Sequence, residues 1–194
     1  SVSNDDTGIA ILSNSIFSNA GLGIDLAGNG VSLNDLGDDD VGPNNLQNFP
    51  VLNSVSTSAN QVTIAGTLNS QPNSTYTLQF FAVAAADSSG HGEGQTLIGT
   101  AAATTDAAGN ASFSFNFAKT LAAGAWVSAT ATDGGNNTSE FSRATTGSNQ
   151  GTFQFSAANY NTSEGQLTAT ITVSRTGSTA GSAMVHAFLQ DVTT

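Results

Sequence analysis

The segment NDLGDDDVGPNN, residues 34–45, gathers the side chains best suited to bind a ligand. It contains the pattern D-x-D-x-G-x-N, which sets carboxylate and amide oxygens at alternate positions around a glycine. Loops that bind calcium use oxygens of this kind, so the segment predicts a calcium site. The candidate ligands are Asn34, Asp35, Asp38, Asp40 and Asn44. A solvated linker stiffened by Pro43 is the alternative that the pattern leaves open.

The side chains that enzymes use for nucleophilic or acid–base chemistry form no recognisable arrangement in this sequence. There is no cysteine, which excludes thiolate chemistry and cysteine-ligated zinc. His91, in SGHGEG, has no second histidine or paired carboxylate at metal-ligand spacing, so we expect a surface loop residue. No serine stands in a nucleophile elbow. We therefore expect the protein not to be an enzyme.

The charge balance restricts the partners of the protein. Three basic residues stand against fourteen acidic ones, for a net charge of −11. Nucleic-acid binding needs clustered Lys and Arg, so nucleic acid is excluded as a partner. No apolar run is long enough for membrane insertion. Abundant Ser, Thr, Asn and Gly, with little Lys, indicate a bacterial secreted or surface protein, and we expect an extracellular or cell-surface location.

Short runs of alternating apolar residues fill the centre of the chain, from about residue 49 to residue 146. Runs of this period, separated by turn clusters such as NSQPNS, DAAGN and DGGNN, predict an antiparallel β-sandwich of immunoglobulin-like size. Tyr76 and Trp126 fall on such runs, so core packing is a better interpretation for them than a sugar-binding platform. The residues expected on inward faces are Val62, Ile64, Gly66, Leu68, Tyr76, Leu78, Phe80, Ala82, Ala111, Phe113, Phe115, Phe117, Val127, Ala129 and Ala131.

Five stretches of this central segment resemble immunoglobulin-like modules that occur in tandem in large bacterial surface proteins. They are GPNNLQNFPVL, YTLQFFA, GEGQTLIG, TTDAAGNASF and ATATDGGNNTSEFS, and the segment in which they lie covers roughly half of the chain. The resemblance implies a structural or adhesive module. It implies no catalytic residues.

Two copies of one short strand pattern, GIAI at residues 8–11 and GIDL at residues 23–26, flank SNSIFSN near the N-terminus. The stretch AGLGIDLAG fits a calcium-binding RTX nonapeptide only once, whereas RTX calcium ions are shared between successive repeats. The arrangement instead resembles one coil of a right-handed parallel β-helix of the pectate-lyase type. Enzymes of that type cleave acidic polysaccharides with Arg or Lys and bound calcium. No basic residue precedes Lys119, so the resemblance implies a fold here and no activity.

The C-terminal segment begins with an aromatic-rich run, GTFQF, followed by SEG, an alternating apolar run and RTG. This order resembles the opening of a Calx-β domain, which is itself a β-sandwich. Only about half of such a sandwich would fit in the residues that follow. The resemblance implies Glu164 as a calcium ligand, and a hairpin-turn role is the alternative for that residue.

These patterns predict an all-β chain with four parts. They are a partial parallel β-helix coil at 1–33, an acidic linker at 34–48, an antiparallel immunoglobulin-like sandwich at 49–146 and a partial Calx-β-like strand group at 147–194. Both terminal modules look incomplete, and unpaired strand edges are templates for pairing with another chain.

The function that this organisation favours is structural. We expect a subunit or segment of an extracellular bacterial fibre or surface assembly that self-associates through its terminal modules, or that continues into a longer chain. The residues expected at the assembly surfaces are Ile9, Ile11, Ile16, Phe17, Ile24, Leu26, Phe153, Phe155, Leu167, Ile171 and Val173. Two alternatives stay open: an adhesive or carbohydrate-binding module of a giant secreted adhesin, with a glycan contact, and an accessory part of a polysaccharide-acting β-helix enzyme.

Overall fold

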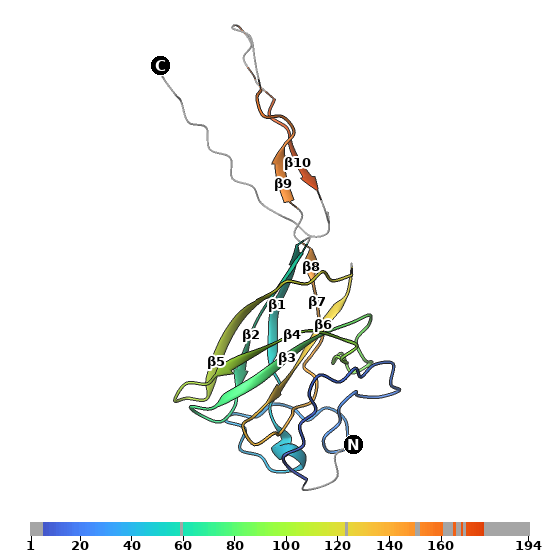
Figure 1. Ribbon diagram of the computed structural model, residues 1–194, viewed down its shortest axis with the longest axis vertical. Helices are drawn as coiled ribbons and strands as arrows, with labels where there is room; N and C mark the ends of the chain where they lie inside the picture. The colour runs from blue at the N-terminus through green and yellow to red at the C-terminus, as the bar shows by residue number, and fades with distance from the viewer. Residues whose placement is uncertain are drawn as a thin grey trace. The chain divides into compact units, whose positions relative to one another are not determined.

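The structure is a computed structural model that describes residues 6–58, 60–122, 124–149, 152–160, 165, 168 and 170–176 (Figure 1). Contacts along the chain divide it into two compact units, Ser1–Gly147 and Ser148–Thr194. Each unit is described by itself. Among the described residues, none of the helices has the length and apolar character needed to cross a membrane.

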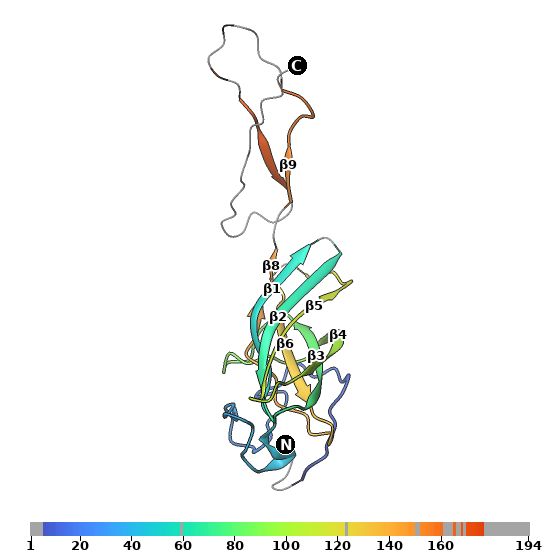
Figure 2. The ribbon, with the colours of Figure 1, turned by 90° about the vertical axis from the view of Figure 1, so that its left-hand side faces the viewer.

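The first unit contains two antiparallel sheets, which Figure 2 shows as separate layers. One sheet has the strand order β5-β2-β1, and the other has the order β4-β3-β6-β7. This β-sandwich-like, antiparallel architecture confirms the all-β prediction at the level of fold class. The elements are η1 (Pro43–Leu46), a 3₁₀ helix, β1 (Val51–Ser58), β2 (Gln61–Asn69), β3 (Thr75–Val83), β4 (Thr96–Thr104), β5 (Asn110–Phe117), β6 (Trp126–Thr132) and β7 (Thr145–Thr146).

The core between the two sheets follows the predicted alternation. Side chains in a strand point to opposite faces in turn, so every second residue is directed inward. In β2 the positions of Val62, Ile64 and Leu68 are fully buried, and in β6 Val127, Ala129 and Ala131 are buried. Phe80 of β3 lies at the centre, with its ring centroid 5.7 Å from that of Phe113 in β5. Tyr76 is also buried in this core, as predicted.

Residues 6–50, which we call the N-terminal segment, correct the prediction of a parallel β-helix coil. The described part of this segment contains no strand, and its one β-bridge joins Ile16 to Gly94. Instead, its apolar residues cover the outer face of the second sheet, where they pack in a second core around Phe81 and Phe141. A solenoid coil needs neighbouring coils to bury its apolar side. Here the outer face of the β4-β3-β6-β7 sheet buries these apolar residues instead of a neighbouring coil.

This packing decides the exposure of the N-terminal residues that were assigned to assembly. Ile24 and Leu26 are buried in the second core, and Leu26 is 0% exposed. Ile11 and Ile16 are partly buried against the same cluster. Only Ile9 and Phe17 of this set have more than a third of their surface exposed, at 37% and 45%. The second core consists of Ile11, Ile16, Ile24, Leu26, Leu46, Phe81, Leu97 and Phe141.

The second unit contains β8 (Ser148–Asn149), β9 (Thr152–Phe155) and β10 (Val173–Thr176). β9 and β10 form a two-stranded antiparallel sheet in which Phe155 is opposite Val173 and Phe153 is opposite Arg175. Four apolar side chains that were assigned to assembly are at least a third exposed: Phe153, Phe155, Ile171 and Val173. Leu167 and Glu164 lie outside the described residues.

Candidate metal centre

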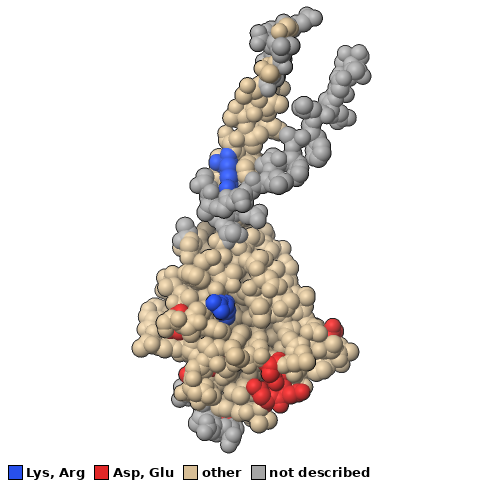
Figure 3. Space-filling model, turned by 180° about the vertical axis from the view of Figure 1, so that it is seen from behind, with Lys and Arg blue, Asp and Glu red and all other residues tan. Residues whose placement is uncertain are grey.

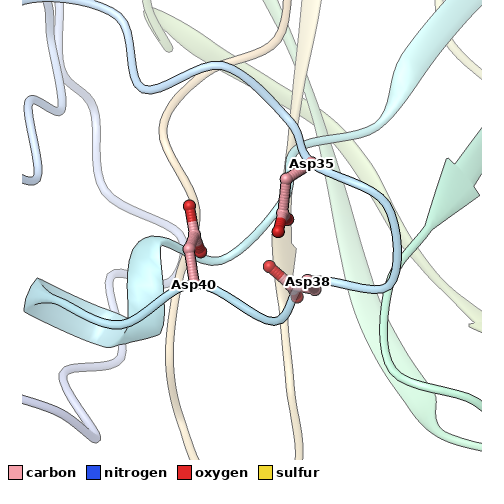
Figure 4. Close-up of side chains that lie close together, drawn as sticks. All are labelled: Asp35, Asp38 and Asp40. Carbon is pink, nitrogen blue, oxygen red and sulfur yellow. The ribbon is translucent and has the colours of Figure 1, made fainter.

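Three carboxylates meet in a loop near the end of the N-terminal segment. Asp35, Asp38 and Asp40, which we call the Asp cluster, point toward one another in Figure 4. Each offers one oxygen, and these three oxygens lie within 4.8 Å of one another. Calcium binds oxygens at about 2.3–2.6 Å, so two of its ligands can be up to about 5 Å apart. The Asp cluster has the spacing needed to hold a metal ion such as calcium.

Asp38 is the fixed member of the cluster. Its side chain is only 7% exposed, and its backbone has a left-handed φ of 58°. Its carboxylate accepts hydrogen bonds from the backbone nitrogen of Asn48 at 2.9 Å and from Nε2 of Gln47 at 2.6 Å. The hydroxyl of Ser70 donates a further hydrogen bond to it. Ser70 follows β2 and also lies 2.7 Å from the Tyr76 hydroxyl, so Asp38 is anchored directly to the sandwich.

The amide side chains of Asn48, Asn69 and Gln71 shape the rest of the loop. The Asn48 side chain accepts a hydrogen bond from the backbone nitrogen of Asp35 at 3.1 Å and donates one to the Asp35 carbonyl at 2.8 Å. Asn69, at the end of β2, accepts a hydrogen bond from the backbone nitrogen of Gly37 at 2.8 Å. Gln71 donates to the carbonyl of Asp38 at 2.6 Å. These contacts hold the loop backbone in place and leave the carboxylates to face one another.

The electrostatics of the cluster favour a cation. The pKa of Asp38 is raised to about 6. Burial is the largest cause, hydrogen bonds from Ser70 and Asn48 act against it, and the charges of Asp35 and Asp40 act with it. Burial also raises the pKa of Asp40, with repulsion from Asp35 as the next cause. Oδ1 of Asp35 and Oδ1 of Asp40 are both buried and have no hydrogen-bond partner. Buried polar atoms are rarely left without a partner, and a bound ion is one explanation for such atoms.

The two asparagines predicted as ligands bind backbone instead. The Asn34 side chain pairs with the backbone of Phe49, donating to its carbonyl at 2.8 Å and accepting from its nitrogen at 3.0 Å. The Asn44 side chain accepts from the Ile9 nitrogen at 2.9 Å and donates to the carbonyls of Ile9 and Thr138 at 2.8 and 3.0 Å. Asn44 is 0% exposed and links the N-terminal segment to the sandwich. The structure therefore brings together the three aspartates, and gives Asn34 and Asn44 other partners.

Two buried glutamates that the sequence analysis did not single out clamp the N-terminal segment. Glu140, 2% exposed, accepts hydrogen bonds from the backbone nitrogens of Leu26 and Ser32 at 3.0 and 2.9 Å. Glu93 accepts from the backbone nitrogens of Ser18 and Asn19 at 2.8 and 3.0 Å. Burial raises the pKa of Glu140, while these hydrogen bonds lower it. The signal was available, because each glutamate stands alone in an otherwise uncharged stretch, GHGEGQ or NNTSEFS.

His91 corrects a second prediction, because it is a core residue and not a surface one. Its side chain is 8% exposed, and its Nδ1 lies 2.9 Å from the carbonyl oxygen of Phe141. The imidazole ring meets the Phe49 ring edge-on, with the ring centroids 5.1 Å apart. His91 thus fixes the loop that carries Glu93. A glycine-rich loop reads as solvent-exposed from sequence, but here glycines such as Gly92 allow close packing, because an added Cβ would lie 2.1 Å from the Ser128 Cβ.

Comparison with known proteins adds no identification. No protein-family model matches the chain, and no curated protein matches it.

Proposed function

We propose that the protein is a calcium-stiffened structural module of an extracellular bacterial fibre or surface assembly. The observation that carries the proposal is the pair of buried, unpartnered carboxylate oxygens on Asp35 and Asp40 beside the buried Asp38. A divalent cation would supply both oxygens with a partner and would neutralise most of the charge that the three carboxylates concentrate.

The ion would act as a mechanical tie. Asp38 is bonded to the sandwich through Ser70, and Asp35 and Asp40 belong to the same loop of the N-terminal segment. A cation held by all three would join the loop to the sandwich at one point, and would fix the orientation of the N-terminal segment on the sheet that it covers. Calcium sites of extracellular modules are weak, with dissociation constants of about 0.1–1 mM, which suits a site of three carboxylates in an environment rich in calcium.

The composition of the strands supports a structural role. The strands β1 to β7 contain no charged residue, and the face of the first unit that Figure 3 shows is mostly neither acidic nor basic. We infer an immunoglobulin-like sandwich from its size and from the motifs that resemble tandem surface modules. Such a module transmits force or spaces other domains, and neither task needs a reactive centre.

The second unit supports assembly. An isolated two-stranded hairpin is marginal in water, so further strands are needed to make a stable sheet. Phe155, 62% exposed, and Ile171, 46% exposed, lie on the sheet of β9 and β10 or beside it. We propose that strands outside the described residues, whether of the same polypeptide or of a neighbouring copy, complete this unit as a Calx-β-like sandwich.

Calcium titration tests the proposal. Isothermal titration calorimetry on chelator-treated protein is expected to give one site with a dissociation constant of about 0.1–1 mM. Calcium at about twenty times that constant is expected to raise the free energy of unfolding by about 2 kcal/mol. Both effects should be lost in Asp35→Asn and Asp40→Asn, which keep the shape of the side chain and remove its charge.

Asp39→Asn is the matched control. Asp39 lies in the same loop, is exposed and is not a member of the cluster. Asp39→Asn removes one negative charge from the loop, as the two test variants do, but from a side chain outside the Asp cluster. It should therefore leave the calcium affinity within about twofold of the wild-type value. If the wild-type protein gives no calcium-dependent heat or stabilisation, or if Asp40→Asn binds as the wild type does, the calcium-stiffened module is wrong.

A further inference from the structure

The strand β5 ends one sheet of the first unit and pairs on one side only. Its residues align with β2 in an unbroken antiparallel register, from Asn110 opposite Asn69 to Phe117 opposite Val62. The sheet order β5-β2-β1 leaves the other side of β5 without a strand among the described residues. An edge strand of this kind presents a row of backbone N–H and C=O groups that can pair with another chain.

Natural edge strands are usually protected by charges, proline or bulges, and β5 has none of these devices. Its sequence is NASFSFNF, with no charged residue and no proline, and its register with β2 shows no shift. The neighbouring edge, β4, differs. Its pairing with β3 is shifted between Phe80 and Phe81, which bends and twists an edge, and the N-terminal segment bonds to the chain just before it, at Gly94 and Gln95. The edge at β4 is therefore protected against pairing with another chain, whereas the edge at β5 is not.

The apolar side of β5 is also incompletely covered. Phe113 is buried, but Phe115 and Phe117 of the same face are only partly buried. The three rings form a row along the strand, with centroids 5.5 Å apart for Phe113 and Phe115 and 6.5 Å apart for Phe115 and Phe117. A strand added beside β5 would cover the open side of this row. The exposed alternate residues, Ser112, Ser114 and Asn116, are neutral, so they would not oppose the addition.

We propose that β5 is an interface between two copies of this chain, which pair antiparallel through their β5 strands about a two-fold axis. The occupant is a second copy because the strand complements itself. In an antiparallel β5–β5 pair, the phenylalanine face of each strand meets the phenylalanine face of the other, and the Ser and Asn faces meet likewise. The pairing would join the two three-stranded sheets into one.

The interface lies in the sandwich itself, so it needs neither the Asp cluster nor the second unit. It is expected to be weak, because one pair of strands buries less area than a permanent dimer does. Tethered or concentrated copies would populate it, as in a surface assembly.

The test is sedimentation velocity on the full chain over a range of concentrations, in saturating calcium and again in chelator. The wild-type protein is expected to show reversible, concentration-dependent association in both conditions. Ser114→Lys places two ammonium groups face to face near the middle of the paired strands, and juxtaposed like charges oppose association. We expect its dissociation constant to rise at least tenfold.

Thr67→Lys is the matched control, because Thr67 is exposed on the same face of the sheet but lies on β2, one strand further from the edge. There the two lysines are separated by additional strands, and salt screens charges beyond about 8–10 Å. Thr67→Lys should leave dimerisation nearly unchanged. Thermal unfolding of both variants checks that each remains folded.

Hydrogen exchange gives an independent measurement. Backbone amides of β5 that point away from β2 should exchange more slowly as the concentration rises, and those of β1 should not change. Two results would overturn the proposal: a wild-type protein that stays monomeric at every concentration, or association that Ser114→Lys and Thr67→Lys weaken equally.

Discussion

Glu140 and Leu26 are 114 positions apart in the sequence, yet the carboxylate of Glu140 accepts a hydrogen bond from the Leu26 backbone nitrogen at 3.0 Å. The same carboxylate accepts another from Ser32 at 2.9 Å. The sandwich thus provides, with one side chain, the partners that a neighbouring strand would otherwise provide. This contact explains how an N-terminal segment without strands stays attached to the sheet.

Removal of the Glu140 carboxylate should destabilise the fold. Glu140→Ala would leave the buried backbone donor of Leu26 and the partly buried donor of Ser32 without acceptors, and a lost buried partner costs about 1–3 kcal/mol for each group. We expect the free energy of unfolding in urea to fall by about 3 kcal/mol, with a smaller loss for Glu140→Gln, which keeps one acceptor oxygen. A loss below 0.5 kcal/mol (about the effect of a surface substitution) in Glu140→Ala would show that the contact contributes little.

Leu26 should behave as a core residue although it lies outside every strand. It is 0% exposed and packs in the second core. Truncation of a buried leucine costs about 2–5 kcal/mol, so Leu26→Ala should lower the free energy of unfolding by that amount. Leu33→Ala, in the same segment but at a side chain that is 78% exposed, is the control and should change it by about 0.5 kcal/mol or less. Equal effects of the two variants would contradict the packing of the N-terminal segment.

Stability should rise on mild acidification when calcium is removed. The pKa of Asp38 is raised from 3.8 to about 6 in the folded protein, so the folded state binds a proton more readily than the unfolded state. Stability is therefore lowest above the folded pKa and increases as pH falls through it, to its full extent below the unfolded pKa. Between pH 7 and pH 5 we expect a gain of about 1 kcal/mol from this group. The raised pKa values of Asp40 and Glu140 act in the same direction.

Calcium should change that pH dependence, because a bound cation favours the ionised carboxylates. In saturating calcium the gain on acidification is expected to vanish or to become a loss, as protons displace the ion. Urea denaturation at pH 7 and pH 5, with calcium and with chelator, measures both effects. Asp38→Asn, which cannot titrate, should flatten the chelator curve; a curve that keeps its slope in this variant would assign the pH dependence to other groups.

Assembly through the second unit predicts a calcium-independent role for its exposed aromatic residues. Phe155 is 62% exposed on β9, and Phe155→Ser should reduce any filaments or oligomers seen by electron microscopy of the full chain. Leu36→Ser removes an even more exposed apolar side chain, 82%, from the first unit and is the control. Equal reduction by both variants would indicate non-specific hydrophobic association in place of completion of the β9–β10 sheet.

The strands and the Asp cluster were accessible from sequence because their signals are local. Apolar and polar residues alternate in VTIAGTL and ASFSFNF with the period of a strand. The pattern arises because one face of the strand is buried and the other is not. Asp38 and Asp40 were found because short loops bring nearby carboxylates together, whatever the rest of the fold does. The partners of Asn44 could not be predicted in this way: its spacing fits a loop ligand, but its side chain bonds to Ile9 and Thr138, which are distant in sequence.

The sequence by itself determined that this chain is all-β, rich in uncharged antiparallel strands, and acidic at one loop, since each of these properties depends on neighbours along the chain. Only the tertiary structure decided what the N-terminal segment does. GIAI and GIDL have the composition of short strands, but a strand needs a partner edge, and the partner that the fold offers is a sheet face with Glu93, Glu140 and Phe81 in place. Hydrogen-bond partners more than seventy residues away decide whether the segment forms a β-helix coil or packs on the outer face of the sheet. A local sequence pattern contains no information about such distant partners.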